Sequence, residues 1–199
     1  LGTEHVDVAT SYNNLSSLHS ALGETDQAKE YFNRALEMYL QKLGAEHVNV
    51  ATSYNNLSSL HSALGETDQA KEYYQRALEI HLKKLRAEHV DVAASYNNVG
   101  SLHCALGERH QAKDHYKRGV EIRLKKLGAE HVDSAHSYDN LGCVHIEVGE
   151  FEGVQHCLDR ALAIYISKYG QGHVSEVKFR RNLSRLQKKG RESRIMKLF

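Results

Sequence analysis

The chain has 199 residues, of which 41% are hydrophobic and 26% are charged, and its formal net charge at pH 7 is +1. This composition is typical of a folded protein rather than a disordered one, and no run approaches the roughly 18 apolar residues that span a bilayer. Three cysteines, Cys104, Cys143 and Cys157, are too few for a disulfide framework and favour reduced thiols in a cytoplasmic protein. Leu1 in place of an initiator Met indicates a cut edge.

The sequence repeats itself with a period of 42 residues. Residues 4–44 and 46–86 differ at seven of 41 positions, and SYNNLSSLHSALGETDQAKEY stands unchanged at 11–31 and 53–73. A fixed period in this range is typical of a solenoid, in which each unit buries its apolar face against the next. The predicted organisation is four repeats at 4–44, 46–86, 88–128 and 130–170, then a capping helix at 172–190 and a basic tail at 191–199.

Each repeat is predicted to contain two helices. The first helix of the first copy is expected from about residue 6 to 22, because apolar and packing residues recur at steps of three or four: Val8, Tyr12, Leu15, His19 and Leu22. Gly23 is expected to end it, and Thr25 or Asp26 to cap the next helix. The second helix has the same spacing at Ala28, Tyr31, Phe32, Ala35, Leu36, Tyr39 and Leu43.

The fourth copy diverges most from the others. Asp139 replaces an Asn, Cys143 replaces a Ser, and GVQHC at 153–157 replaces QAKEY or QAKDH. Atypical residues are expected at the end of a stack, where a unit has a different neighbour. The segment 173–186 matches the first helix of a fifth unit and reads as the capping helix.

These positions resemble the tetratricopeptide repeat family. Its W-x-x-L-G-x-x-Y…A-x-x-x-F-x-x-A pattern falls on Tyr12, Leu15, Ser16, His19, Ala28, Phe32 and Ala35. The longer 42-residue unit, with H-x-x-V-A-x-x-Y-N-N-L at its start, is similar to the arrays of kinesin light chain and nephrocystin-3-like proteins. The resemblance covers about residues 4–186 and implies an all-α fold, a right-handed α-solenoid of helix-turn-helix repeats.

The resemblance also implies a peptide-binding groove along the first helices, lined by side chains that follow the packing Tyr. The candidate groove residues are Asn13, Asn14, Ser17, Asn55, Asn56, Ser59, Asn97, Asn98, Ser101, Asp139, Asn140 and Cys143. A primary amide both donates and accepts, so it can pair with the backbone of an extended peptide. The alternative is that the Asn side chains bond across neighbouring repeats to hold the superhelix, and both roles can coexist.

The distribution of charge limits the kinds of ligand that the sequence predicts. The groove stripe of Thr10, Thr52, Ala94 and His136 lacks the Lys and Arg that clamp a carboxylate, so we expect a fairly neutral extended ligand. Residues 178–199 hold nine basic side chains against one acidic side chain. This tail could meet an acidic partner, a membrane surface or calmodulin, although a solubilising cap is the simpler reading. Nucleic acid is not expected, since no interleaved aromatics appear.

Neither a metal site nor an enzyme is expected. The recurring histidines lie 42 residues apart and do not converge as zinc ligands must; the most suggestive cluster, His136, Cys143 and Cys104, is better explained as variable groove positions. No catalytic motif, phosphate loop or cofactor site is recognisable.

The sequence therefore predicts a non-catalytic interaction scaffold or adaptor that binds an extended peptide or partner helix. One alternative is a passive structural arm of a larger multidomain protein. Another is a regulatory repeat that self-associates end to end through its terminal faces.

Overall fold

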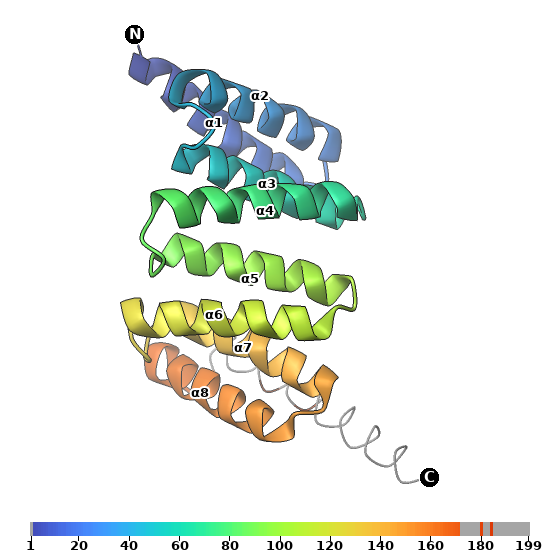
Figure 1. Ribbon diagram of the computed structural model, residues 1–199, viewed down its shortest axis with the longest axis vertical. Coiled ribbons are helices and arrows are strands. Elements are labelled where there is room, and N and C mark those ends of the chain that lie inside the picture. Colours follow the sequence, from blue (N-terminus) through green and yellow to red (C-terminus); the bar gives the residue numbers. More distant parts are fainter. Residues whose placement is uncertain (1, 172–179, 181–183, 185–199) are drawn as a thin grey trace. The chain divides into compact units, whose positions relative to one another are not determined.

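A computed structural model describes residues 2–171, 180 and 184, and within them the chain is all-helical, as predicted (Figure 1). The helices are α1 (Gly2–Ala21), α2 (Thr25–Leu43), α3 (Val48–Ala63), α4 (Thr67–Lys84), α5 (Val90–Ala105), α6 (Arg109–Leu127), α7 (Val132–Val148) and α8 (Phe151–Tyr169). Within the described residues, α1 packs against α2, α3 against α4, and α7 against α8. Two compact units, residues 1–102 and 103–199, are described separately below. The predicted capping helix and basic tail lie outside the described residues, apart from Arg180 and Ser184.

Glycine ends the helices where the sequence predicts it. Gly23 has φ of +78° and Gly44 has φ of +82°, a left-handed region that a side chain at Cβ disfavours. The predicted cap at Thr25 or Asp26 is wrong, because both residues lie inside α2. The N-cap is Glu24, whose side chain makes no capping bond and instead contacts His19 at 2.5 Å.

That contact recurs as a histidine–glutamate pair across the turn of every helix pair. The four pairs are His19–Glu24, His61–Glu66, His103–Glu108 and His145–Glu150. A lysine from the preceding pair joins two of them: Lys29 Nζ lies 3.1 Å from Glu66, and Lys113 Nζ lies 2.5 Å from Glu150. These lysines and the paired histidines lower the pKa of both carboxyl groups. The polar links therefore couple consecutive pairs as well as closing each turn.

A second set of histidines caps the first helices. The Nδ1 atoms of His47, His89 and His131 each accept a hydrogen bond from the backbone N–H two residues later, at 3.1–3.2 Å. Such a bond satisfies one of the amide groups left free at a helix start. The 42-residue spacing of these histidines thus has a local structural cause.

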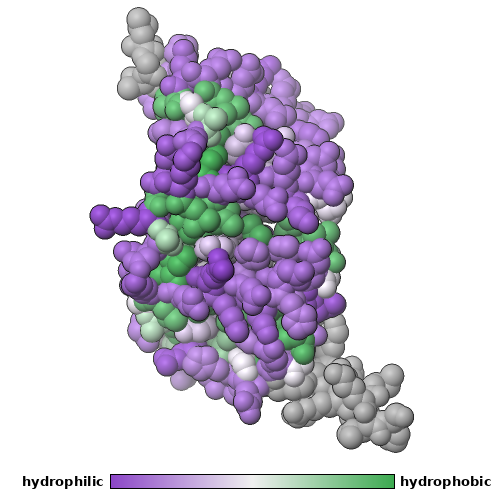
Figure 2. All heavy atoms as spheres, in the orientation of Figure 1, coloured by the Kyte–Doolittle hydropathy of each residue, from purple (hydrophilic) through white to green (hydrophobic). Residues whose placement is uncertain are grey.

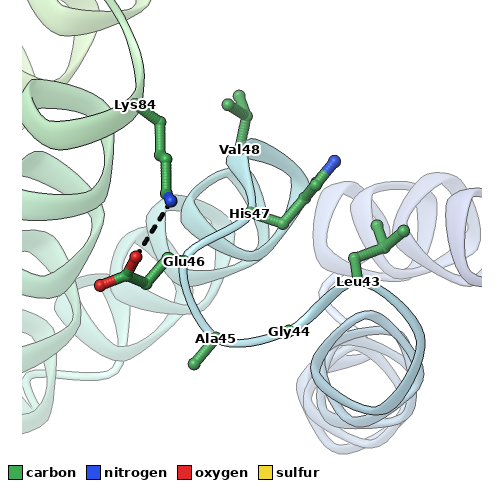
Figure 3. A pocket seen from close by; sticks show the side chains of 7 residues that line it. All are labelled: Leu43, Gly44, Ala45, Glu46, His47, Val48 and Lys84. Atoms are coloured by element: carbon green, nitrogen blue, oxygen red, sulfur yellow. Dashed lines mark ion pairs between the residues drawn. The ribbon is translucent and has the colours of Figure 1, made fainter.

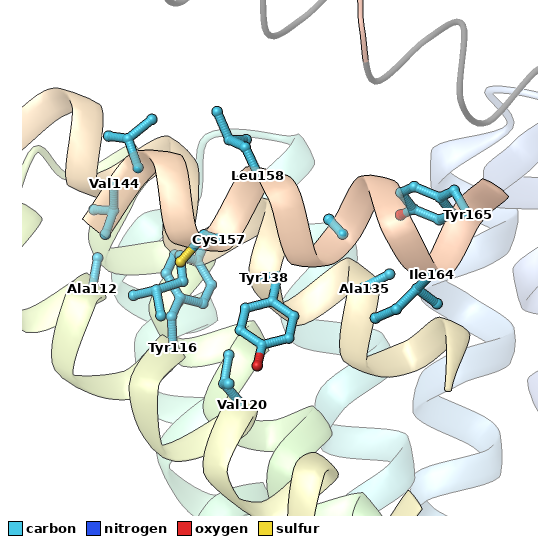
Figure 4. Close-up of a cluster of buried hydrophobic side chains, with 13 residues drawn as sticks. Ala112, Tyr116, Val120, Ala135, Tyr138, Val144, Cys157, Leu158, Ile164 and Tyr165 are labelled. Atoms are coloured by element: carbon cyan, nitrogen blue, oxygen red, sulfur yellow. The ribbon is translucent and has the colours of Figure 1, made fainter. Parts of the chain in front are cut away.

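Small and aromatic residues fill the space between pairs. In the first unit, Ala28, Ala35 and Ala51 are fully buried, while the larger Phe32 and Leu57 pack around them. In the second unit Tyr116, Tyr138 and Ile164 belong to an equivalent cluster (Figure 4). Alanine at the crossings lets the helix backbones approach closely, and the large residues then fill the volume to either side.

The first helix of the first copy has the predicted apolar spacing, but two leucines on it are not buried. Leu15 is 42% exposed and Leu18 is 56% exposed, whereas the matching Leu57 and Leu60 of α3 are 0% and 3% exposed. Helix α2 covers α3, and no helix of the described chain covers α1 in the same way. Figure 2 shows one face of the molecule, on which apolar side chains are exposed among a largely polar surface.

Two leucines in the same sequence word should therefore differ in their contribution to stability. Leu57→Ala should destabilise the protein by about 3 kcal/mol, because it opens a cavity in a closed core. Leu15→Ala should cost less than about 1 kcal/mol, since the side chain is already partly in water. Urea unfolding followed by circular dichroism measures both, and equal losses would contradict the assigned burial.

Candidate functional site

The two Asn residues of each repeat occupy different environments in the first unit. Asn13 is 8% exposed, and its Nδ2 donates to Ser53 Oγ of the next pair at 3.2 Å. Asn55 Nδ2 donates to Ser95 Oγ in the same way at 3.4 Å. The cross-repeat bonds that the sequence left as an alternative are therefore present at these two positions. Within the described chain, the Oδ1 atoms of Asn13 and Asn55 are buried without a hydrogen-bond partner.

The second Asn is the more accessible one in the first and third copies. Asn13 and Asn97 are buried, whereas Asn14 is exposed and Asn98 is half-buried. In the second copy Asn55 and Asn56 are both half-buried and differ in the hydrogen bond that Asn55 donates to the next repeat. The sequence assigned one role to these adjacent positions, and the structure distinguishes them.

The predicted serines lie on the same faces and are exposed. Ser17 Oγ and Ser101 Oγ each donate to the backbone carbonyl four residues earlier, at 3.0 Å. Ser59 instead contacts the hydroxyl of Tyr74 at 2.8 Å. The hydroxyl protons of Ser17 and Ser101 are therefore engaged by the backbone of their own helices.

A hollow of about 250 Å³ brings several of these residues together between α1 and α3. Its lining consists of Thr10, Asn13, Asn14, Ser17, Tyr39, Asn49, Thr52 and Asn56. All of these side chains are uncharged, as the sequence predicts for the groove. Asn55 and Ser59 are not among the lining residues. The sequence reasoning did not identify Tyr39, which it placed in the core, or Asn49.

Tyr39 belongs to a polar position that varies between copies. Residues Tyr39, His81, Arg123 and Tyr165 stand 42 apart, and each reaches from a second helix to a polar side chain of a first helix. Arg123, for example, donates to Ser137 Oγ at 2.6 Å. The sequence signal for this polar position was that its residue changes between copies that are otherwise nearly identical. Because the residue in the third copy is Arg123, the second unit carries a cation that the first-helix residues alone did not predict.

Asp139 stands in the fourth copy where the others have the first Asn. Tyr165 donates its hydroxyl proton to Asp139 Oδ2 at 2.8 Å, and the same hydroxyl lies 3.2 Å from His136 Nδ1. Burial raises the pKa of the Asp139 carboxyl to about 6, against a lowering by the Tyr165 hydrogen bond. Partial desolvation and the Asp139 charge raise the pKa of Cys143 to about 11. That thiol is protonated at neutral pH and is a poor nucleophile.

Another hollow, of about 430 Å³, lies at the turn between α2 and α3 (Figure 3). The backbone of residues 44–47 forms much of it, and Lys84 Nζ pairs with Glu46 Oε2 at 3.0 Å. The Lys84 side chain reaches the turn from α4, so this ion pair ties the turn to the next helix pair. Its charged groups satisfy each other and do not converge on the open space, which makes it a weaker candidate than the hollow between α1 and α3.

Across the residues that the structure describes, no group of three His, Cys, Asp or Glu side chains is placed to hold a metal ion. The cluster of His136, Cys143 and Cys104 does not form one. No helix in the described part of the chain is both long enough and apolar enough to cross a bilayer.

The comparison with protein families identifies this architecture. The sequence model described as "Tetratricopeptide repeat" matches residues 7–83 and 91–167. The chain belongs to the tetratricopeptide repeat family. Such repeats generally mediate protein–protein interactions, and their fold is typically non-catalytic. A comparison with curated protein sequences found no match.

Solved structures of tetratricopeptide type are similar to this chain. A putative kinesin light chain with nearly identical TPR-like repeats from Podospora anserina has 23% identity and a TM-score of 0.78, with 95% of this chain and 90% of that chain covered. BtubC (BKLC) from P. vanneervenii has 28% identity and a TM-score of 0.73, with 83% of this chain covered. The present chain spans 66% of BtubC, just under two thirds. The expected kinesin-light-chain type of repeat is thus confirmed.

The different environments of the paired amides give a direct stability prediction. Asn55→Ala should destabilise the protein by about 1 kcal/mol relative to Asn56→Ala, because only Asn55 donates to the next repeat. Both substitutions replace Asn by Ala in the same helix, so both raise helix propensity by the same amount and Asn56→Ala is a matched control. Urea unfolding provides the measurement, and a larger loss for Asn56→Ala would contradict the assignment.

The buried carboxyl of Asp139 should make stability depend on pH. Its pKa is about 6 in the folded chain against an ordinary 3.8, so the folded state binds this proton more tightly and stability falls as pH rises between those values. Asp139→Asn should therefore raise the free energy of unfolding by about 2 kcal/mol near pH 7.5. The gain should shrink towards zero as the pH falls to about 4.

Urea unfolding at several pH values tests this, with the exposed Asp159 changed to Asn as control. A gain of equal size at both ends of the pH range would show that ionisation of Asp139 is not its cause.

Proposed function

We propose that this chain is a non-catalytic scaffold or adaptor that binds an extended peptide or partner helix along its first helices. The observation that carries the proposal is the uncharged hollow between α1 and α3, with Asn14 and Asn56 on its wall. Amide groups on such a wall can donate to and accept from a peptide backbone without requiring a charged ligand. The primary binding positions are Asn14, Asn56, Asn98 and Asn140, with the exposed serines beside them.

The Asn residues that bond across repeats play a supporting part in this proposal. Asn13 and Asn55 hold neighbouring first helices together, which fixes the spacing at which the second Asn residues are presented. A rigid spacing lowers the entropy lost when a peptide binds. In the second unit, Arg123 and Asp139 add one charge of each sign, so the segment bound there should carry polar side chains.

A passive structural arm is the second candidate role. The apolar face of α1 is favourable evidence, because Leu15 and Leu18 repeat the residues with which α3 packs against α2. Such a face suits a longer array in which another helix pair precedes α1. End-to-end self-association through this face is a third candidate role. It would give a mass that rises with concentration in light scattering, whereas a passive arm would not.

The basic segment near the C-terminus and the cysteines also belong to the proposal. The basic segment 178–199 is proposed to meet an acidic partner, and most of it lies outside the described residues. The three cysteines are unpaired thiols, which suits a cytoplasmic protein.

The test of groove binding compares two variants with four substitutions each. Asn14, Asn56, Asn98 and Asn140 are changed to Ala in the first. The control changes four exposed amides of second helices to Ala: Gln27, Asn33, Gln69 and Gln75. Partners are captured from lysate with wild type, their shared segment is mapped with overlapping peptides, and its affinity is measured by calorimetry.

The groove variant should bind that segment at least about tenfold more weakly than wild type, since each lost neutral hydrogen bond is worth about 1 kcal/mol. The control should bind like wild type, and circular dichroism should show both folded. Equal affinity of all three proteins would overturn the groove proposal and favour the structural arm.

A further inference from the structure

The fourth helix pair lacks an aromatic ring that the other pairs have at the same register. The residues at this register are Tyr31, Tyr73, His115 and Cys157. In the second pair the Tyr73 ring stacks on Tyr54, with 5.4 Å between ring centroids, and lies 5.5 Å from the His61 ring. Aromatic pairs at such distances contribute beyond their buried area. The fourth pair keeps the two partner rings, Tyr138 and His145, but has only a thiol at this register. The His156 ring meets Tyr138 edge-on, with 6.1 Å between centroids, and does not stack on it as Tyr73 stacks on Tyr54.

A cavity of about 340 Å³ lies where the ring is missing, and we call it the Cys157 pocket. It is formed by α6, α7 and α8 within the second unit. Tyr138, Leu141 and Cys157 line it and are 5%, 6% and 2% exposed, and Val120 of α6 adds a further apolar wall. Figure 4 shows Tyr138 directed from α7 towards Val120. The exposed Lys117, Glu121 and His156 also line the pocket and mark its solvent side.

His145 and Gly153 shape the inner wall of the Cys157 pocket. A Cβ atom at Gly153 would lie 2.7 Å from Cε1 of His145, so glycine is required for the imidazole to stand where it does. The earlier copies have glutamine at this register: Gln27, Gln69 and Gln111. Burial lowers the pKa of His145, against a raising by its hydrogen bond to Glu150. The wall is thus an imidazole ring opposite an apolar floor.

We propose that the Cys157 pocket binds one aromatic side chain of a partner protein, which takes the place that Tyr73 fills in the second pair. The chemistry matches, because a ring there meets the Tyr138 and His145 rings and the Leu141 side chain. The volume of this open hollow falls in the range of small-ligand sites, and its Tyr138 and Leu141 walls suit contact with an aromatic ring.

A side chain suits the pocket better than a free molecule because of its solvent side. Lys117 and Glu121 stand there as ions of opposite sign, which can bond the peptide groups that flank an inserted residue. The site is also separate from the groove. Tyr138, Leu141 and His145 fall on one face of α7 by helical spacing, and Asp139 and Cys143 fall on the opposite face.

The experiment uses the whole chain and two probes, phenol and the blocked tripeptide acetyl-Gly-Tyr-Gly-amide. Binding is followed through backbone amide resonances in ¹H–¹⁵N spectra. Wild type should show saturable shifts near Tyr138, His145 and Cys157 with dissociation constants of about 1 mM or below. The tripeptide should bind at least as tightly as phenol.

Two substitutions that restore earlier-copy residues should weaken both probes at least about tenfold. Cys157→Tyr fills the pocket, and Gly153→Gln removes the present wall, because its Cβ would lie 2.7 Å from the His145 ring and force that ring to move. The second variant keeps the test decisive if the first does not fold. The reverse change, Tyr73→Cys, should open a matching site and produce new shifts near Tyr54 and His61.

Absence of saturable shifts in wild type up to about 10 mM of either probe would overturn the proposal. Unchanged binding by folded Cys157→Tyr or Gly153→Gln would also overturn it, since the probes would then lie elsewhere. If phenol bound about tenfold more tightly than the tripeptide, the pocket would not be a site for a partner side chain. None of these results depends on the groove.

Discussion

The packing of each second helix against the first helix of the next pair is the contact on which the other features depend. Alanines at the crossings, such as Ala35 and Ala51, are fully buried and bring the backbones close together. Because the helices are then held at a fixed separation, short polar side chains can bridge them. The Asn13–Ser53 hydrogen bond and the Lys29–Glu66 ion pair both span consecutive pairs in this way. Exposed ion pairs contribute little by themselves, so the apolar contact supplies most of the stability.

The same constraint explains why identical words in the sequence have different roles. Leu15 and Leu57 occupy the same place in the same word, yet only Leu57 is covered, because burial depends on the neighbouring pair. The fourth copy shows the opposite situation, in which the neighbours are kept and the residue changes. Cys157 in place of the tyrosine of the first two copies leaves Tyr138 without the stacked ring that Tyr54 has in Tyr73, although His156 meets it edge-on. A substitution in one copy of a repeat array therefore indicates a candidate binding site where the new side chain is smaller and leaves a hollow.

The all-α architecture, the helix pairs and their glycine turns were predictable, since they depend on the spacing of residues such as Ala28 and on the conformation that Gly23 adopts. The capping of α2 was not, because the Glu24 side chain bonds His19 instead of a backbone amide. A His followed five residues later by a Glu recurs in all four copies, and this repeat was the sequence signal for the His–Glu contact. The predicted N-cap failed because Thr25 lies one residue inside the helix.

The candidate groove was predictable in composition but not in detail. Adjacent positions such as Asn13 and Asn14 point about 100° apart on a helix, so one meets the next repeat and the other meets solvent. Which does which depends on where the neighbouring helix lies, and sequence spacing alone does not fix that. Tyr39 was missed for a related reason, because a residue counted in the core also reaches Thr10 across the pair with its hydroxyl.

The central claim is that the first Asn of the first two repeats serves the array while the second is left for a ligand. Side-chain amide hydrogen exchange, followed by NMR on the free protein, tests it most directly. The Nδ2 protons of Asn13 and Asn55 should exchange more slowly than those of Asn14 and Asn56, because Asn13 and Asn55 donate to a serine of the next pair. Equal rates, or slower exchange at Asn14 and Asn56, would contradict the account.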